Sequence, residues 1–259
     1  GFGGGWASAA GDVEGDGDND LVIFMGSWLD WRLNQDGLQA EADGPRQIGP
    51  VIAGPERNGQ YGSILLGHLN QDDRLDGVVV GCCGRPFTTD PDSTAPNVSG
   101  VWLNTWQEQE YIGEMTALAD LTGLAVQDAA LGDFDGDGDL DLFAAVIAPP
   151  EGRNTNPADR LLLNDGQGAF TDSGQRLGDW DSTAVALGDV DGDGDLDALT
   201  GSHDGAHVWL NLDAQGGPAG VLTQGAQTLP VRQPQAAYLA DLDNDGDLDA
   251  VLAGQRSAG

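Results

Sequence analysis

Short apolar segments alternate with turn-forming residues along the whole chain. Segments such as 142–146 (LFAAV) and 208–210 (VWL) are bounded by clusters of Gly, Asp and Asn. Runs of this length, rich in β-branched and aromatic residues and separated by turn residues, are typical of strands and not of helices. The pattern predicts an all-β protein of many short strands, and a content of 41 glycines and 12 prolines agrees with it.

An acidic stretch of nine residues recurs between these strands. Its clearest copy is 189–197 (DVDGDGDLD), which places five aspartates at alternate positions. We number its residues as positions 1 to 9 and call the copies loops 1 to 5, which are 12–20, 68–76, 133–141, 189–197 and 241–249. The loops begin 56, 65, 56 and 52 residues apart, a period typical of propeller blades and similar repeats.

The segments around each loop repeat as well. A strand of small residues precedes loop 4 (AVAL, 184–187), and an apolar strand follows each loop. A third strand ends in Asn at residues 34, 104, 164 and 211, and a tight turn such as 164–168 (NDGQG) leads to a fourth strand. Each unit is therefore predicted to be a four-stranded antiparallel meander, and the units begin near residues 6, 60, 126, 183 and 235.

These repeats resemble the FG-GAP, or VCBS, repeat of integrin-alpha-type β-propellers. The resemblance is carried by the five loops, by 184–201 (AVALGDVDGDGDLDALTG) and by 161–178 (LLLNDGQGAFTDSGQRLG), and it extends over nearly the whole chain. It implies that residues 1–259 form about 4.5 blades of a β-propeller, and that the ring is larger, since relatives are seven-bladed. Other segments or chains are expected to complete the last blade, because an incomplete blade exposes a strand edge.

The spacing of the carboxylates in loops 1, 3, 4 and 5 predicts cation binding. Carboxylates this close repel each other unless a cation neutralises them, and oxygen ligands at alternate positions favour Ca²⁺ over Mg²⁺. The analogy with the first half of an EF-hand loop assigns the side chains of positions 1, 3 and 5, the carbonyl of position 7 and position 9 as ligands. About four Ca²⁺ sites are predicted, at Asp12, Glu14, Asp16, Asp18, Asp20, Asp133, Asp135, Asp137, Asp139, Asp141, Asp189, Asp191, Asp193, Asp195, Asp197, Asp241, Asp243, Asp245, Asp247 and Asp249.

Loop 2 departs from this pattern. His68 replaces the first aspartate, Asp73 replaces the turn glycine and Arg74 takes position 7. We expect a metal-free structural turn there, although Asn70, Asp72 and Asp76 leave weak binding open. An EF-hand is excluded for the other four loops, because position 12 holds Ile23, Ala144, Thr200 or Leu252 and not the bidentate glutamate.

The charge of the chain limits its partners and its location. A formal charge of −33, from 43 acidic and 10 basic residues, disfavours binding to nucleic acid and to anionic membrane surfaces. No apolar run is long enough to cross a bilayer. Predicted dependence on calcium points to a secreted or cell-surface protein. The adjacent Cys82 and Cys83 form neither a disulfide framework nor a zinc motif, and whether they pair with each other stays open.

The loops after the second and fourth strands should carry a ligand, at the end of the sheets opposite the acidic loops. The candidate contact residues there are Arg85, Phe87, Arg153, Trp180, His203 and Asp204. The function expected is adhesion to, or binding of, a protein or glycan. A lyase-like polysaccharide-processing enzyme and a purely structural spacer repeat are the alternatives. Enzymatic activity is not favoured, because the chain has three histidines and no Gly-x-Ser-x-Gly motif.

Overall fold

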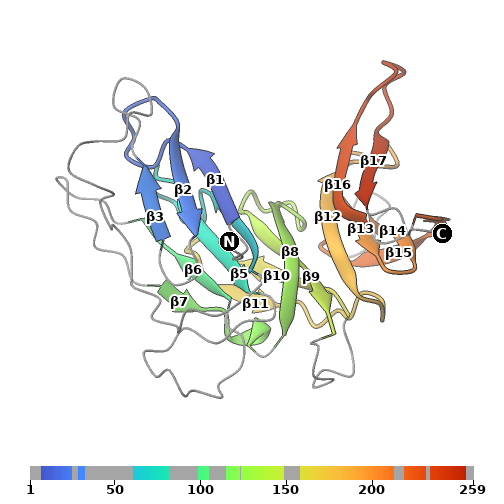
Figure 1. Ribbon diagram of the computed structural model, residues 1–259, viewed down its shortest axis with the longest axis horizontal. Coiled ribbons are helices and arrows are strands. Elements are labelled where there is room, and N and C mark those ends of the chain that lie inside the picture. The colour runs from blue at the N-terminus through green and yellow to red at the C-terminus, as the bar shows by residue number, and fades with distance from the viewer. Residues whose placement is uncertain are drawn as a thin grey trace, which may run out of the picture. The chain divides into compact units, whose positions relative to one another are not determined.

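The computed structural model describes residues 7–24, 29–32, 61–81, 99–104, 115–122, 124–148, 158–212, 219–231 and 234–254. These residues form antiparallel sheets and one short 3-10 helix, η1 (Ala119–Leu121), as Figure 1 shows. Within these ranges there is no helix that is long and apolar enough to span a bilayer. The prediction of an all-β protein is confirmed.

The chain divides into two compact units, and the first comprises residues 1–125 with 166–168. It contains two sheets. Sheet 1 has the order β1 (Ala7–Gly11), β2 (Asp20–Phe24) and β3 (Leu29–Arg32). Sheet 2 has the order β4 (Tyr61–Gly67), β5 (Asp76–Gly81), β6 (Gly100–Trp102) and β7 (Met115–Ala117).

The second unit comprises residues 126–165 and 169–259. Sheet 3 contains β8 (Ala125–Gly132), β9 (Asp141–Ile147), β10 (Arg160–Asn164) and β11 (Phe170–Asp172). Sheet 4 contains β12 (Ser182–Gly188), β13 (Asp197–Ser202), β14 (Gly205–Asn211) and β15 (Leu222–Leu229). Sheet 5 is formed by β16 (Pro234–Ala240) and β17 (Asp249–Gly254).

Strand order and register in each sheet are those of a meander. Neighbours along the chain are neighbours in the sheet, and the acidic loop joins the first strand to the second, as in the pairing of Gly188 with Asp197. Sheets 2, 3 and 4 therefore have the four-stranded blade topology that the repeat predicts. Four-stranded antiparallel meanders of this kind are the blades from which β-propellers are built.

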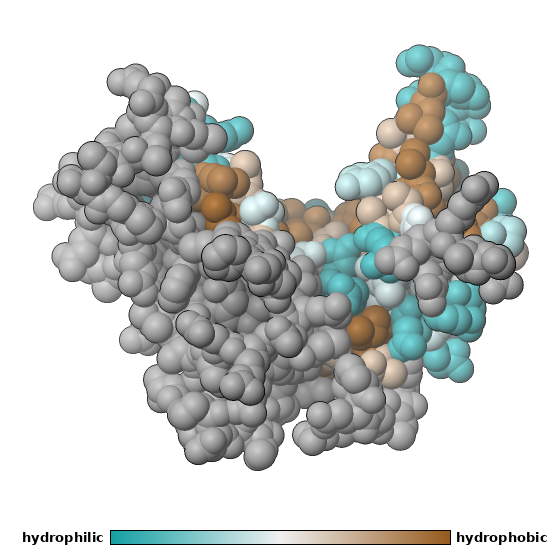
Figure 2. Space-filling view, viewed as in Figure 1, coloured by the Kyte–Doolittle hydropathy of each residue, from teal (hydrophilic) through white to brown (hydrophobic). Residues whose placement is uncertain are grey.

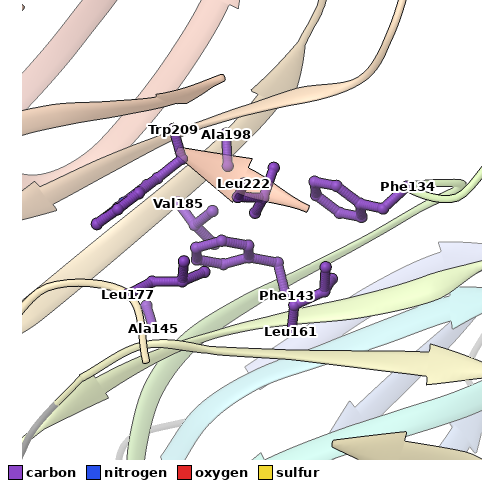
Figure 3. Packing of buried hydrophobic residues seen from close by; sticks show 9 residues of the cluster. All are labelled: Phe134, Phe143, Ala145, Leu161, Leu177, Val185, Ala198, Trp209 and Leu222. Carbon is purple, nitrogen blue, oxygen red and sulfur yellow. The ribbon is translucent and has the colours of Figure 1, made fainter. Parts of the chain in front are cut away.

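Successive residues of a first strand pack on opposite sides of their sheet, because side chains alternate along a strand. Val185 of β12 packs with Phe143 and Leu161 of sheet 3 in the cluster that Figure 3 shows. Leu187 of the same strand packs against this cluster. Ala184 and Ala186 pack into a second cluster with Ala237 and Leu239 of sheet 5. Sheet 4 is thus apolar on both faces.

A glycine precedes each of loops 1 to 4, and at loops 1, 3 and 4 it lies against the next sheet. A Cβ atom at Gly188 would come within 2.6 Å of Leu248 and 3.3 Å of Leu239. The same contact occurs between Gly132 and the pair Leu187 and Leu196, and between Gly11 and the pair Leu66 and Leu75. Close approach, and not an unusual backbone angle, disfavours a larger residue at these glycines. We call this contact the glycine–leucine contact.

Asp159 is a fully buried carboxyl that connects three strands of the second unit. Its Oδ1 accepts from the backbone N–H of Val146 at 2.8 Å, and its Oδ2 accepts from the Ser182 hydroxyl at 2.8 Å. Its backbone pairs with that of Leu177. Burial raises the pKa of Asp159 to about 8, and the two hydrogen bonds and nearby Arg160 oppose this only in part.

This raised pKa predicts how stability depends on pH. An unfolded Asp has a pKa of 3.8, so between that value and about 8 the folded protein holds one more proton at Asp159 than the unfolded chain does. The free energy of unfolding contributed by this group therefore falls as pH rises, by up to about 1.4 kcal/mol per pH unit. Asp159→Asn removes this dependence and keeps both contacts. Urea unfolding measures the free energy of unfolding at about pH 5 and at about pH 8. Its decrease between these two pH values should be smaller for the variant than for the wild type. Equal decreases would contradict the raised pKa of Asp159.

Candidate metal centres

The aspartate at position 9 of each loop is tied to the backbone. Asp197 is fully buried, and its two carboxylate oxygens accept from the backbone N–H groups of Val190 and Asn211, both at 2.8 Å. Asp141 makes the equivalent pair of bonds with Phe134 and Asn164, both at 2.9 Å. In these loops position 9 thus joins the start of the loop to the end of the third strand.

The aspartate at position 1 closes the loop on itself. The carboxylate of Asp189 accepts from the backbone N–H groups of Gly192, Asp193 and Gly194, at 2.8, 3.0 and 3.0 Å. Gly192 and Gly194 have φ values of 78° and 99°, which favour glycine over any residue with a side chain. Loops 1 and 3 repeat both glycines, and loop 5 has Asn244 with φ 59° in place of the first.

These bonds bring carboxylates of positions 1, 3 and 9 together in three loops. One oxygen from each member of a set lies within 4.8 Å of the others, and the sets are Asp133, Asp135 and Asp141; Asp189, Asp191 and Asp197; and Asp241, Asp243 and Asp249. Three convergent carboxylate oxygens are a donor set suited to a hard divalent cation. The chemistry and spacing of these residues fit Ca²⁺.

Electrostatics favour a cation at these points. Burial raises the pKa of Asp141 to about 6, and the negative charges of Asp135 and Asp137 add to the shift. The pKa of Asp191 is also raised, by burial first and then by Asp193 and Asp189. The unneutralised carboxylates destabilise one another, so a bound cation would relieve both repulsion and burial.

Loop 1 supports the same conclusion through Glu14. Its Oε1 atom is buried without a hydrogen-bond partner, and burial followed by Asp20 raises its pKa. A buried carboxylate oxygen without a donor is costly unless a cation or proton satisfies it. Loop 1 is not among the convergent sets found in the described residues, and its position 3 holds the longer glutamate.

The remaining predicted ligands lie on the same loops but outside these sets, in the part of the chain that the structure describes. At position 5, Asp137, Asp193 and Asp245 each accept from the backbone N–H of position 7, at 2.9 to 3.0 Å. Asp16 accepts from Asp18 in the same way at 3.1 Å. The structure therefore brings three of the five predicted positions together and uses position 5 to shape the turn.

Loop 2 does not fit a cation, because hydrogen-bond donors already contact the groups that would bind it. The His68 Nδ1 atom lies 2.8 Å from the carbonyl of Arg74 at position 7, and it must donate because a carbonyl only accepts. The Asn70 amide donates to the Asp72 carboxylate at 3.1 Å. Asp76 nevertheless keeps both backbone bonds, to Leu69 and Asn104.

Sequence reasoning missed the asparagines that end the third strands. Asn211 is buried, and its side-chain amide donates to the carbonyl of Phe134 in the preceding loop at 2.7 Å. Asn104 donates in the same way to Val13 at 2.7 Å. These residues connect position 9 of one loop to position 2 of the loop before it. The signal was available, because Asn ends the third strand in four of the repeats.

Three ligand-face candidates lie together at the other end of the second unit. The backbone N–H of His203 donates to the carbonyl of Asp181, next to Trp180, and His203 Nδ1 lies 3.2 Å from a carboxylate oxygen of Asp204. The Trp180 ring stacks on His207 with centroids 3.7 Å apart. We call Trp180, His203 and Asp204 the tryptophan corner. The other predicted contact residues and the cysteines lie outside the described residues, namely Arg85, Phe87, Arg153, Cys82 and Cys83.

The His207 side chain behind this corner is buried, and neither of its ring nitrogens has a hydrogen-bond partner. Burial lowers the pKa of His207, and nearby Asp204 opposes the shift. Burial therefore favours the neutral imidazole, which acts as a packing surface for Trp180. Trp180 is accordingly not fully exposed, and the polar side chains of His203 and Asp204 are the most accessible part of the corner.

The difference between loop 2 and the acidic loops predicts that loop 2 can be converted to a metal site. The triple variant His68→Asp, Gln71→Gly and Asp73→Gly restores the missing carboxylate and the two turn glycines, so we expect one more bound Ca²⁺ per chain than in the wild type. Equilibrium dialysis with elemental analysis measures this number. The variant with the two glycines alone is the control and should bind no extra ion. An unchanged number in the triple variant would show that His68 is not what excludes the ion.

Comparisons with known proteins agree with the geometry of these loops. The profile of the FG-GAP-like repeat matches residues 133–200 and 189–252. A comparison with curated proteins finds no match.

A solved structure of an Agrocybe aegerita lectin that specifically recognises non-reducing terminal N-acetylglucosamine is similar in fold. Its TM-score is 0.52 at 17% sequence identity, over 95% of this chain and 60% of the lectin chain. This chain therefore spans less than two thirds of the lectin, and at this identity the likeness concerns the fold alone. The two repeat matches identify residues 133–252 as FG-GAP-like repeats, and the blade topology of sheets 3 and 4 agrees with them.

Proposed function

We propose that the protein is a calcium-stabilised extracellular module that binds a glycan. The observation that carries the metal part is the convergence of three carboxylate oxygens in loops 3, 4 and 5. Oxygen ligands alone, with no nitrogen or sulfur donor among them, favour Ca²⁺ over transition metals. Loop 1, with its unsatisfied Glu14 oxygen, is the fourth proposed site.

Bound calcium would reduce the electrostatic strain of the folded chain. Four divalent ions would change the formal charge from −33 to about −25, and they would do so at the points of greatest repulsion. Each site held at about 100 times its dissociation constant stabilises the folded state by about 2.7 kcal/mol. Such saturation is reached most readily at the calcium concentrations found outside cells, which favours an extracellular location.

The glycan part rests on the tryptophan corner and on the likeness to the lectin. Antiparallel pairing places this corner at the end of the strands opposite the acidic loops, so metal and ligand do not compete for one surface. The side chains of His203 and Asp204 are 64% and 78% exposed and offer a hydrogen-bond donor and acceptor for sugar hydroxyls. Terminal N-acetylglucosamine is the first ligand to test, because the similar lectin recognises it.

Calcium removal should lower the stability of the protein, and two alanine variants separate the roles of the carboxylates. Thermal and urea unfolding with calcium and with a chelator should differ by about 2.7 kcal/mol per occupied site. Asp191→Ala should reduce this difference and change the stability of the chelated protein less than Asp197→Ala does. Asp197→Ala should destabilise even the chelated protein, because the N–H groups of Val190 and Asn211 lose their acceptor at about 1 to 3 kcal/mol each. If the free energy of unfolding is the same with calcium and with the chelator, the calcium sites are refuted.

Glycan binding should depend on the tryptophan corner. We expect binding on a glycan array that is lost in the double variant His203→Ala and Asp204→Ala, whereas Gln227→Ala, an exposed change on β15, should bind as the wild type does. The same glycans incubated with the protein should be recovered intact. Cleaved or unsaturated products would establish a sugar-processing enzyme instead, and an array without any binding would leave the calcium sites standing and refute the glycan part.

A further inference from the structure

Large apolar side chains are exposed at one place in the described part of the chain. Tyr238 is 64% exposed, Leu242 62% and Val251 40%, and all three belong to the hairpin formed by β16, loop 5 and β17. Figure 2 shows a band of apolar surface along this hairpin. Tyr238 and Val251 pair across the two strands, so they share one face of sheet 5. We call this face, with Leu242, the Tyr238 face.

The repeat identifies what this face is built to contact. Counted from loop position 1, Val251 corresponds to Leu199 in sheet 4 and to Phe143 in sheet 3, which are 1% and 0% exposed. Leu199 is buried in the cluster between sheets 4 and 5, and Phe143 in the cluster between sheets 3 and 4. Tyr238 corresponds in the same way to Ala186, which packs toward sheet 5. The Tyr238 face therefore occupies the side on which another sheet of the repeat packs.

Leu242 gives an independent indication. Its equivalents in loops 1 and 3, Val13 and Phe134, are 3% and 1% exposed. The carbonyls of both accept from a third-strand asparagine of the next sheet, Asn104 and Asn211. A sheet that covers the Tyr238 face would bring such an asparagine to Leu242.

The size of the side chains restricts which sheet can dock. Ala240 stands where loops 1 to 4 are preceded by glycine, and it is exposed. In the glycine–leucine contact, a Cβ at the glycine would lie 2.2 to 2.6 Å from a leucine at position 8 of the next loop. A docking sheet with that leucine would collide with Ala240, and the bulk of Tyr238 in place of alanine would add to the collision.

Sheet 1 has smaller or more polar residues at the corresponding positions. Ala10 replaces the leucine two residues before the loop, and Asn19 replaces the leucine at position 8. Ala10, Asn19 and Ser8, which takes the place of Val185, are all exposed. The third-strand motif of this repeat also ends in an asparagine, Asn34, which lies outside the described residues. The small residues of sheet 1 are complementary in size to the large residues of sheet 5.

We propose that the Tyr238 face is an intermolecular docking surface that takes sheet 1 of a second copy of this chain. The contact is head-to-tail, so it joins different surfaces of the two copies. It does not require the metal or the glycan of the proposed function. Because a charge of −33 makes copies repel each other, association should strengthen when salt screens the charges.

Sedimentation velocity over a wide range of protein concentration at high salt tests this proposal. The wild type should associate reversibly, and Tyr238→Ser with Val251→Thr should raise the dissociation constant at least tenfold. Ala10→Leu with Asn19→Leu, on the other side of the contact, should weaken association to a similar extent. Gln227→Ala is the control and should associate as the wild type does. All these residues are exposed in the described chain, so circular dichroism should show unchanged folding.

A compensating variant makes the test specific. Adding Tyr238→Ala and Ala240→Gly to the two leucine substitutions recreates the glycine–leucine contact of the inner sheets, and association should return. A wild type that stays monomeric at every concentration overturns the proposal, and so does association that the face variants leave unchanged. If association does not return in the compensating variant, the assignment of sheet 1 as the partner is overturned.

Discussion

One buried carboxylate in each of sheets 2, 3 and 4 holds the fold in place, by accepting from two backbone N–H groups that belong to different segments. Asp76, Asp141 and Asp197 each accept from position 2 of their own loop and from the asparagine that ends the third strand. A buried anion satisfied by backbone donors fixes the geometry of the first three strands at once. The side chain of the same asparagine extends this connection to the preceding loop in sheets 2 and 4.

Hydrogen bonds within the chain consequently shape the loops. Position 1 closes the turn, position 5 supports it and position 9 anchors it, all through hydrogen bonds to backbone N–H groups. The proposed metal ion would add stability to a turn that these hydrogen bonds define. Loop 2 illustrates the principle, because it keeps the anchoring Asp76 while donors from His68 and Asn70 replace the positive charge. The structural role of the acidic motif and its proposed metal-binding role can therefore be lost separately.

Sequence periodicity predicted much of this structure, since each blade repeats strand lengths, turn glycines and loop carboxylates at a fixed phase. It predicted the meander and the position of the acidic loop between first and second strands, and both are confirmed. It could not distinguish a carboxylate that belongs to a convergent set from one that only shapes the turn, because Asp197 and Asp193 are identical residues in one alternating pattern. It also gave no indication that Trp180 would stack on His207, since that contact joins elements distant in sequence and depends on how sheets 3 and 4 pack.

The glycine–leucine contact has a consequence for how such arrays lengthen. An inner repeat carries both halves of the contact. The repeat of loop 4, for example, has Gly188 on the side of sheet 5, and has Leu187 and Leu196 against Gly132 of sheet 3. A duplication of the DNA that encodes one repeat therefore copies the glycine side and the leucine side together. The new repeat can then pack against the original one without further substitution. Repeats that break the rule, as those with Ala10 and Ala240 do, would need further substitutions before a copy could stack in the same way.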